Sequence, residues 1–227
     1  LEKINGLAPG ETLLLHGVTG SGKTEVYLQA IAAELEAGRG AIVMVPEIAL
    51  TPQTVQRFAS RFGDKVAVLH SALSDGERYD EWHRIRSGAA QVVVGPRSAG
   101  FAPVKNLALI VVDEEHDSSY KQDDNPRYNA RDAAVLRGAI EGAKTVLGSA
   151  TPSLETWCNA AAGKYVKVEM KTRAGAGTLP RVQLVDMERE GGKIFSADLL
   201  DAIKVRLDRH EQTILFLNRR GYSRSVV

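Results

Sequence analysis

The chain contains very little cysteine and carries no excess of charge of either sign. Cys158 is the only cysteine among 227 residues, so this chain can form neither an internal disulfide nor a thiolate zinc site. The 29 Lys and Arg residues nearly balance the 28 Asp and Glu residues, which leaves a formal net charge of +1. Total charge therefore gives no sign of nucleic-acid binding, and a DNA site would have to be a local patch.

Long hydrophobic runs are also missing. No apolar stretch is long enough to cross a membrane, and the first residues, LEKINGLAPGE, lack the basic start and apolar core of a secretory signal. We therefore expect a reduced, cytoplasmic setting with no membrane partner. The chain starts at Leu1 without Met and stops in SRSVV, which suggests a piece of a longer protein.

Short β-branched runs alternate with helical patterns along the whole chain. This alternation predicts an α/β fold with a doubly wound, mostly parallel sheet. The expected strands are 12–16, 41–46, 65–70, 91–95, 107–113 and 145–151. The expected helices are 24–38, 52–62, 74–88, 130–142 and a last one that is capped by Thr151 and runs through Ala162.

A glycine-rich stretch, KTRAGAGTLP, interrupts this pattern near residue 175. It predicts a first lobe at 1–172, a linker at 173–180 and a second α/β unit at 181–227. The second unit should contain strands at 182–187 and 213–221 and a helix from Ser196. It is too short to close a sheet of its own.

The segment GVTGSGKT matches the phosphate-binding pattern GxxxxGK[ST], between an apolar strand and a helix. Backbone N–H groups of such a loop surround phosphates, Lys23 reaches the β- and γ-phosphates, and Thr24 offers a hydroxyl to Mg²⁺. The predicted ligand is ATP with Mg²⁺. The predicted contacts are Gly17, Val18, Thr19, Gly20, Ser21, Gly22, Lys23 and Thr24.

A buried strand, LALIVVD, delivers Asp113 and Glu114 to its carboxyl end, the edge where such sheets bind ligands. We expect Asp113 to hold Mg²⁺ and Glu114 to activate the attacking water, so that Lys23, Asp113 and Glu114 form the catalytic set. An acidic loop that caps a helix is the alternative explanation, and the phosphate-binding loop upstream makes it the less favoured one.

The order of motifs resembles superfamily 2 helicases. DEEH at 113–116 and GSAT at 148–151 match motifs II and III, while PEIALTPQ, GPRSAGFAP and ILFLNRRGY resemble motifs Ia, Ib and IV. With DEEHDSSYKQ and RYNARD, nearly the whole chain resembles the PriA family of replication-restart helicases, also called primosomal protein N′.

The resemblance implies an ATP-dependent 3′–5′ DNA helicase that acts at stalled forks during primosome assembly. It implies a RecA-like lobe followed by the start of a second one. The implied partners are single-stranded and forked DNA, primosome proteins and single-strand-binding proteins. The implied DNA contacts are Arg97, Lys121, Arg127, Tyr128 and Arg131, and the residues implied to couple DNA to ATP are His116, Ser149 and Thr151.

Each of these assignments has a plainer alternative. Arg97 could be an ordinary surface arginine, the loop after DEEH could be a solvated connection, and Ser149 and Thr151 could belong to a strand end with an N-cap. The family's zinc-binding region, its N-terminal DNA-binding region and its motifs V and VI have no counterpart in this sequence. We therefore expect impaired hydrolysis and no unwinding, and a non-catalytic, nucleotide-gated DNA-binding module is the alternative function.

Overall fold

The computed structural model describes residues 1–174, 181–190 and 194–216. The chain divides into two compact units, residues 1–177 and 178–227. The first unit holds every strand that the described residues form. Among the described residues, no helix is both long and apolar enough to cross a membrane.

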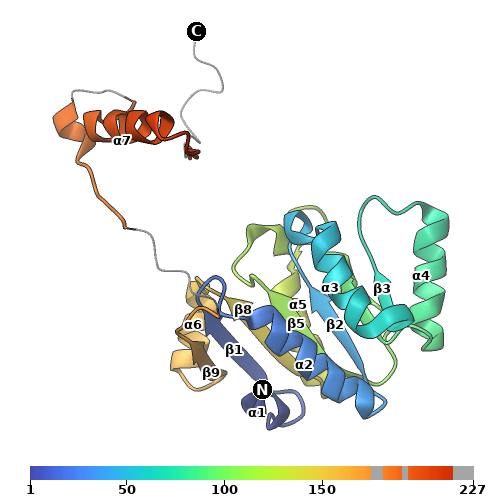
Figure 1. The fold of residues 1–227 in the computed structure, drawn as a ribbon. Coiled ribbons are helices and arrows are strands. Elements are labelled where there is room, and N and C mark those ends of the chain that lie inside the picture. The colour runs from blue at the N-terminus through green and yellow to red at the C-terminus, as the bar shows by residue number, and fades with distance from the viewer. Residues whose placement is uncertain (175–180, 191–193, 217–227) are drawn as a thin grey trace. The chain divides into compact units, whose positions relative to one another are not determined.

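A seven-stranded sheet forms the centre of the first unit (Figure 1). All its pairings are parallel, and the strand order is β3-β4-β2-β5-β8-β1-β9. This confirms the predicted α/β class. The strands are β1 (Thr12–Gly17), β2 (Gly40–Met44), β3 (Val66–Val68), β4 (Val92–Gly95), β5 (Leu107–Asp113), β8 (Lys144–Ser149) and β9 (Val166–Met170).

Helices cover both faces of this sheet, because the central strands are apolar on both sides. Leu13 and Leu14 on β1 point to opposite faces, and each is fully buried. One face packs against α1 (Glu2–Asn5), α2 (Lys23–Glu36) and α3 (Pro52–Phe62), which contribute Ile4, Tyr27 and Phe58 to one core cluster. A second core cluster includes residues of α4 (Asp75–Ser87) and α5 (Ala130–Glu141).

The predicted helix starts are mostly confirmed by their caps. Thr51 caps α3 by accepting from the Thr54 N–H, and Ser74 and Glu77 form a capping box at α4. The predicted cap at Thr151 is wrong, because α6 (Leu154–Ala161) begins later and its cap is Ser153. Strand β8 ends at Ser149, and the bend within residues 150–153 directs the Thr151 hydroxyl toward His116 Nε2.

Strand β9 was not predicted, although VKVEM alternates apolar and charged residues as an edge strand does. A two-stranded antiparallel hairpin of β6 (Lys121–Gln122) and β7 (Tyr128–Asn129) was also missed. Both of its strands are too short to give a periodic signal. Short 3-10 helices complete the first unit at η1 (Glu47–Ala49), η2 (Gly63–Lys65), η3 (Arg97–Phe101) and η4 (Ser118–Tyr120).

In the second unit, α7 (Ala197–Asp208) confirms the predicted helix, with Ser196 as its N-cap. The strand predicted at 182–187 is wrong: residues 181–186 form no strand, and η5 (Met187–Glu190) follows. Residues 213–216 form no strand either, and the rest of that predicted strand lies outside the described residues. Within the described part of the chain, neither segment has a neighbouring strand to complete its backbone hydrogen bonds. Most of the predicted linker, 175–180, is also outside the described residues, so the predicted domain limits stay a prediction.

Candidate active site

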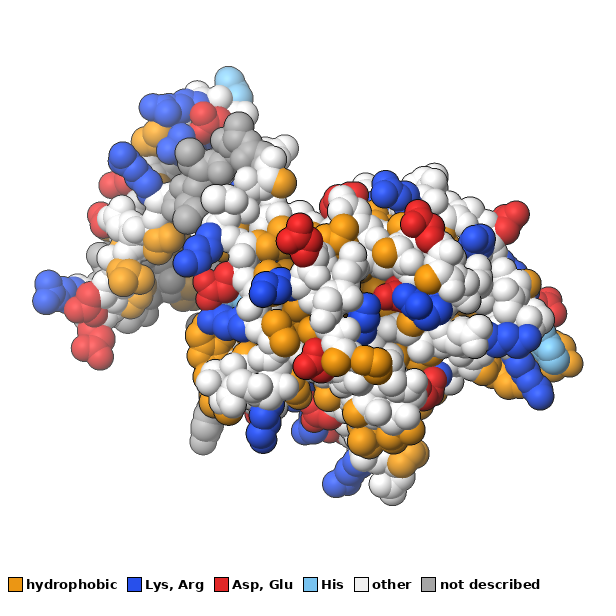
Figure 2. All heavy atoms as spheres, turned by 90° about the horizontal axis from the view of Figure 1, so that it is seen from below, with side chains coloured by type: hydrophobic (Ala, Val, Ile, Leu, Met, Phe, Trp, Pro, Cys, Tyr) orange, Lys and Arg blue, Asp and Glu red, His pale blue; other side chains and the backbone are white. Residues whose placement is uncertain are grey.

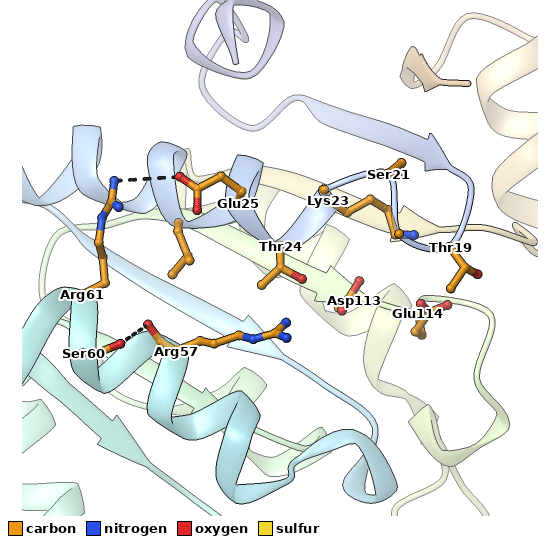
Figure 3. A pocket seen from close by; sticks show the side chains of 13 residues that line it. Thr19, Ser21, Lys23, Thr24, Glu25, Arg57, Ser60, Arg61, Asp113 and Glu114 are labelled. Carbon is orange, nitrogen blue, oxygen red and sulfur yellow. Dashed lines mark hydrogen bonds and ion pairs between the residues drawn. The ribbon is translucent and has the colours of Figure 1, made fainter. Parts of the chain in front are cut away.

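The predicted phosphate-binding loop and the end of β5 line one cavity of about 770 Å³ (Figure 3). The loop connects β1 to α2, and β5 lies one strand away from β1 across β8. Gly20 and Gly22 adopt positive φ angles of 78° and 91°, a conformation that side chains with a Cβ rarely take. The lining residues are Thr19, Gly20, Ser21, Gly22, Lys23, Thr24, Glu25, Leu28, Arg57, Ser60, Arg61, Asp113 and Glu114.

Lys23 and Ser21 place polar groups inside the loop. The Lys23 side chain is buried, and its Nζ donates to the Gly17 carbonyl at 2.8 Å, which holds the ammonium within the turn. The Ser21 hydroxyl is buried and has no hydrogen-bond partner among the described residues. A buried hydroxyl costs free energy unless it is paired. Phosphate oxygens would satisfy both groups, so the loop fits the nucleotide predicted for it.

Asp113 is held in place by two tyrosines. The Tyr27 hydroxyl donates to Asp113 Oδ1 at 2.9 Å, and the Tyr120 hydroxyl donates to the Asp113 carbonyl at 2.7 Å. Burial raises the pKa of Asp113, while the Tyr27 hydrogen bond and the charge of Lys23 act in the opposite direction. Asp113 pairs with Gly148 on β8, and a Cβ built on Gly148 would collide with the Tyr27 hydroxyl oxygen. This motif III glycine therefore makes room for the tyrosine that positions Asp113.

Glu114 follows in a left-handed backbone conformation with a φ of 46°. Such an angle is uncommon for a residue with a Cβ and is often found at functional sites. Partial burial and the neighbouring Asp113 raise the pKa of Glu114, against the attraction of Lys23 and His116. The hard oxygen donors of Thr24, Asp113 and Glu114 are of the type that Mg²⁺ prefers. Among the described residues, no three or more His, Cys, Asp or Glu side chains form a ready metal site, so nucleotide oxygens would have to complete the coordination.

The structure brings the three predicted coupling residues together behind Glu114. The His116 Nδ1 lies 2.8 Å from the Ser149 hydroxyl, and the His116 Nε2 lies 3.4 Å from the Thr151 hydroxyl. The Ser149 hydroxyl also accepts from the Thr151 N–H at 3.0 Å. His116 Nδ1 is 3.7 Å from a Glu114 carboxylate oxygen. A continuous polar chain therefore joins Glu114 to the end of β8, while its coupling role stays a prediction.

Glu115 was not predicted as a functional residue, yet it is the most completely satisfied carboxylate near the site. It is buried and accepts from the Ser153 N–H and hydroxyl and from the Thr156 hydroxyl, at 2.8, 3.0 and 2.8 Å. The Arg131 guanidinium donates to it at 3.2 Å. The sequence shows only that Glu115 is the third acidic residue in a row at the end of a buried strand. The residues that bond to Glu115 are 16 to 41 positions away, so the sequence does not indicate them.

Arg131 occupies a different place from the one expected. Its side chain is buried, with Nη1 on Glu115 and the Ser153 hydroxyl and Nε on Asp132. The structure thus places Arg131 inside the lobe and not on an accessible surface for DNA. The arginine sits at the start of α5, where the buried Glu115 requires a cation.

The other four predicted DNA contacts gather around the β6–β7 hairpin. The half-buried Arg97 donates from Nη1 to the Lys121 carbonyl at 2.9 Å, although 24 residues separate them. The exposed Lys121 and Arg127 both turn toward Asp123, through an ion pair at 3.4 Å and a hydrogen bond to its carbonyl at 3.1 Å. The Tyr128 ring packs edge-on against the Phe101 ring. The structure therefore collects motif Ib and the loop after DEEH on one surface.

Sequence reasoning missed a basic wall of the cavity. Arg57 and Arg61 are one turn apart on α3 and line the cavity opposite the loop. Arg61 lies 4.0 Å from Glu25, whereas the Arg57 guanidinium forms no hydrogen bond or ion pair with any described residue. In Figure 3, Arg57 extends across the cavity toward Thr24 and Asp113. The packing of α3 beside α2 brings these two arginines to the cavity, and the sequence alone does not show that packing.

The family model for DEAD/DEAH box helicases matches residues 2–159, which include the whole cavity. The chain belongs to the DEAD/DEAH box helicase family. This helicase chain is 50% identical over 221 residues to the replication restart protein PriA of Bacillus subtilis, and 50% identical to PriA of Chlamydia pneumoniae. The alignments cover 96% and 95% of the chain, which spans only 28% and 30% of those two proteins. The predicted resemblance to PriA is confirmed.

Solved structures agree with this family. The helicase chain resembles RecG bound to a three-way DNA junction, with 26% identity and a TM-score of 0.58 over 88% of this chain and 25% of the RecG chain. The helicase domain of Hef from Pyrococcus furiosus shares the fold at 21% identity, with a TM-score of 0.51 over 71% of this chain and 35% of that one. The first unit is therefore a RecA-like helicase lobe, as predicted.

Proposed function

We propose that the chain is the ATP-binding lobe of a 3′–5′ DNA helicase of the PriA type, which works at stalled replication forks. The observation that carries this proposal is the shared cavity, in which the Lys23 loop and the Asp113–Glu114 strand end face each other. The 50% identity to PriA proteins supports the choice of substrate and process. The second lobe, the strand polarity and the primosome partners are part of the proposal.

The loop residues bind the triphosphate in this proposal. Backbone N–H groups of residues 17–24 and the start of α2 surround the phosphates, and Lys23 moves from the Gly17 carbonyl to the β- and γ-phosphates. Thr24 and Asp113 hold Mg²⁺, which neutralises phosphate charge when it is bound. Arg57 supplies a further cation from α3, since no acidic side chain in the described part of the chain pairs with it.

Glu114 is the proposed general base. Its pKa is raised by burial and by Asp113, which makes the carboxylate a better proton acceptor than an exposed glutamate. The pKa of Asp113 is raised as well, and the hydrogen bond from Tyr27 and the charge of Lys23 favour its ionised form. The two neighbouring carboxylates thus take different roles because their surroundings differ.

The His116–Ser149–Thr151 chain is the proposed link between ATP and DNA. It touches the Glu114 carboxylate at one end and the turn before α6 at the other. A movement of Glu114 on nucleotide binding would therefore be felt at the end of β8. On the DNA side, Arg97, Lys121 and Arg127 offer cations to phosphates, and Tyr128 offers a ring.

Nucleotide binding and turnover by the 227-residue chain test the proposal. We expect the wild-type chain to bind Mg²⁺ with a non-hydrolysable ATP analogue, and the Lys23→Ala variant to lose that binding. Lys105→Ala is the matched control, because Lys105 is an exposed lysine outside the cavity that donates to the Ser87 carbonyl. Absence of binding by the wild-type chain would overturn the proposal.

Measuring phosphate release with and without forked DNA distinguishes an ATP-hydrolysing lobe from a non-catalytic, nucleotide-gated DNA-binding module. We expect slow release that Glu114→Gln abolishes, since no transition-state arginine from a second lobe is available and such a group is worth about 10³–10⁵ in rate. Release that Glu114→Gln leaves unchanged would favour the nucleotide-gated binding module. Rapid, DNA-stimulated release would contradict the proposed insufficiency of this lobe.

A further inference from the structure

A second cavity lies on the side of the lobe that carries Arg97 and the β6–β7 hairpin. It has a volume of about 480 Å³, within the usual size of small-ligand pockets. Its walls come from five separate parts of the chain, namely η1, the segment after β3, α4, η3 and the hairpin. We call it the ring pocket, because three aromatic side chains line it: Trp82, Phe101 and Tyr128.

Two of these rings are unusually accessible. Phe101 is 58% exposed and Trp82 is 39% exposed. Phe101 meets Tyr128 edge-on, with ring centroids 5.4 Å apart and an angle of 79° between the planes. The Arg86 guanidinium lies 5.0 Å from the centre of the Trp82 ring and supports it from within α4. Large exposed rings that are fixed by neighbours and line a cavity mark a binding surface.

Cations without acidic partners share the same cavity. Arg78 and Arg97 line it, and neither forms an ion pair with a described residue. Their recorded hydrogen bonds go to backbone carbonyls, Leu73 for Arg78 and Lys121 for Arg97. The remaining N–H groups of both guanidinium groups are available to a ligand. Glu47 at the rim adds a carboxylate that can accept hydrogen bonds.

The ring pocket continues into a shallower cavity along the hairpin. That second hollow is lined by Lys121, Asp123, Arg127 and Asn129, and it shares Gln122 and Tyr128 with the ring pocket. A ligand that occupied both would meet rings at one end and cations at the other. A nucleotide in a single strand has this pattern, with an apolar base joined to an anionic phosphate.

We propose that the ring pocket accepts one unstacked nucleobase of a single strand, between Trp82 and the Phe101–Tyr128 pair, while the hairpin cations hold the adjoining phosphates. This inference rests on the proposed function, because it assumes that DNA is the partner. It adds a base-binding site that includes Trp82 and Phe101, which lie outside the predicted DNA contacts. Guanidinium groups and Glu47 would contact the edge of the base, and the rings would contact its faces.

Fluorescence of Trp82 gives a direct test. The chain has two tryptophans, so Trp157→Phe leaves Trp82 as the only reporter. We expect an oligothymidylate to quench Trp82 emission as it binds, and an abasic oligomer of equal length to bind more weakly without quenching. Binding of the oligothymidylate, measured by anisotropy of a label on the strand, without any change in Trp82 emission would overturn the inference. Equal quenching by the abasic strand would overturn it too.

Variants of the rings give a second test. Trp82→Ala should weaken oligothymidylate binding about tenfold, the usual effect of losing one base–ring stack, and Trp82→Phe should restore most of it. Tyr79→Ala is the matched control, because Tyr79 is a 64% exposed ring on the same helix that does not line the pocket. An equal loss from Tyr79→Ala, or no loss from Trp82→Ala, would contradict the inference.

Two kinds of failure remain distinguishable. If the wild-type chain binds no oligomer at low salt, the proposed DNA partner fails, and this inference fails with it. If the oligomer binds but the Trp82 and Phe101 variants bind it equally well, only the ring pocket is wrong. Tight binding of an apolar peptide that quenches Trp82, in a chain that ignores oligothymidylate, would instead assign the pocket to a protein partner.

Discussion

The nucleotide cavity and the ring pocket are built in opposite ways. In the first, the two groups at its centre are fixed by hydrogen bonds, the buried Lys23 to the Gly17 carbonyl and the half-buried Asp113 to Tyr27. In the second, arginines bond mainly to backbone carbonyls and rings remain exposed. The comparison teaches that the lobe fixes its chemistry in advance and leaves its proposed DNA side adaptable.

Charge is distributed accordingly. On the face drawn in Figure 2, which looks at the molecule from below, basic and acidic side chains are interspersed and no broad area of one sign stands out. The formal net charge of +1 likewise shows that positive and negative side chains nearly balance over the whole sequence. Specific cations in the two hollows, and not a general positive field, would therefore have to select nucleotide and DNA.

The largest expected effect separates the two sites. Glu114→Gln removes the proposed base while it keeps the size and shape of the side chain. We expect phosphate release to fall by about 10²–10⁴-fold, the usual contribution of a general base. Oligothymidylate binding should not change, because Glu114 does not line the ring pocket.

Glu25→Gln is the control for that measurement. Glu25 lines the same cavity but is paired with Arg61 on its outer wall. We expect a much smaller effect on phosphate release. Equal losses from the two variants would show that charge in the cavity, and not proton transfer at Glu114, limits turnover.

The second prediction concerns the segment that joins the two sites. Arg131 follows Tyr128 of the ring pocket by three residues and pairs with Glu115, which follows Glu114. Arg131→Ala leaves the Glu115 charge buried and unpaired, so we expect a loss of about 3–5 kcal/mol in the free energy of unfolding, measured with urea. Both sites should fail together as the lobe melts.

Arg127→Ala serves as the comparison for Arg131→Ala. Arg127 is exposed, and among the described residues it bonds to the Asp123 carbonyl alone, so its loss should change the unfolding free energy by less than about 0.5 kcal/mol. It should weaken DNA binding in a folded chain. A folded, stable Arg131→Ala variant with weakened DNA binding would return Arg131 to the DNA contacts first expected for it.

The third prediction tests the basic wall on α3. Arg57→Ala should weaken binding of a triphosphate analogue about tenfold, which is the usual value of one charge-assisted hydrogen bond, and should leave diphosphate binding nearly unchanged. Arg61→Ala is the matched control one turn away, already paired with Glu25. If calorimetry shows equal losses for triphosphate and diphosphate, Arg57 acts as a general cation and not at the γ-phosphate.

Sequence patterns captured the parts of the lobe in which neighbours in the chain are also neighbours in space. The loop at 17–24 and the strand end at Asp113 were identifiable because contiguous residues carry the chemistry. Helices with local caps, such as the Ser74–Glu77 box, were identifiable for the same reason. The Thr151 cap failed because its hydroxyl is directed to His116, 35 residues away.

Residues whose role depends on distant partners could not be predicted. The pairing of Tyr27 with Asp113 spans 86 residues, and the place of Arg57 depends on how α3 packs beside α2. The ring pocket combines five segments from residue 47 to residue 128. Arg131 was expected to contact DNA only from the resemblance of its segment to the family, and its burial against Glu115 could not be read from the sequence.

The smallest expected effect is a change in how thermal stability depends on pH when Asp113 in the nucleotide cavity is replaced. Burial raises the pKa of Asp113 in the folded chain, so stability falls as the pH rises from the ordinary aspartate pKa through the raised folded pKa, and the full cost of the ionised form is present above it. Asp113→Asn removes that cost and keeps an oxygen for the Tyr27 hydroxyl. We therefore expect the variant to have a higher Tm than wild type at neutral pH. The difference should shrink as the pH falls below the folded pKa.

Glu77→Gln should show the opposite sign, because hydrogen bonds from Ser74 lower the pKa of Glu77. Its carboxylate stabilises the capping box above its ordinary pKa, and this contribution disappears as the pH falls through the lowered value. The Gln variant should therefore have a lower Tm at neutral pH and match wild type in acid. If Asp113→Asn also lowered Tm at neutral pH, the contrast would be lost. Asp113 would then be a stabilising charge like Glu77, and its burial in the cavity would not reduce the stability of the lobe.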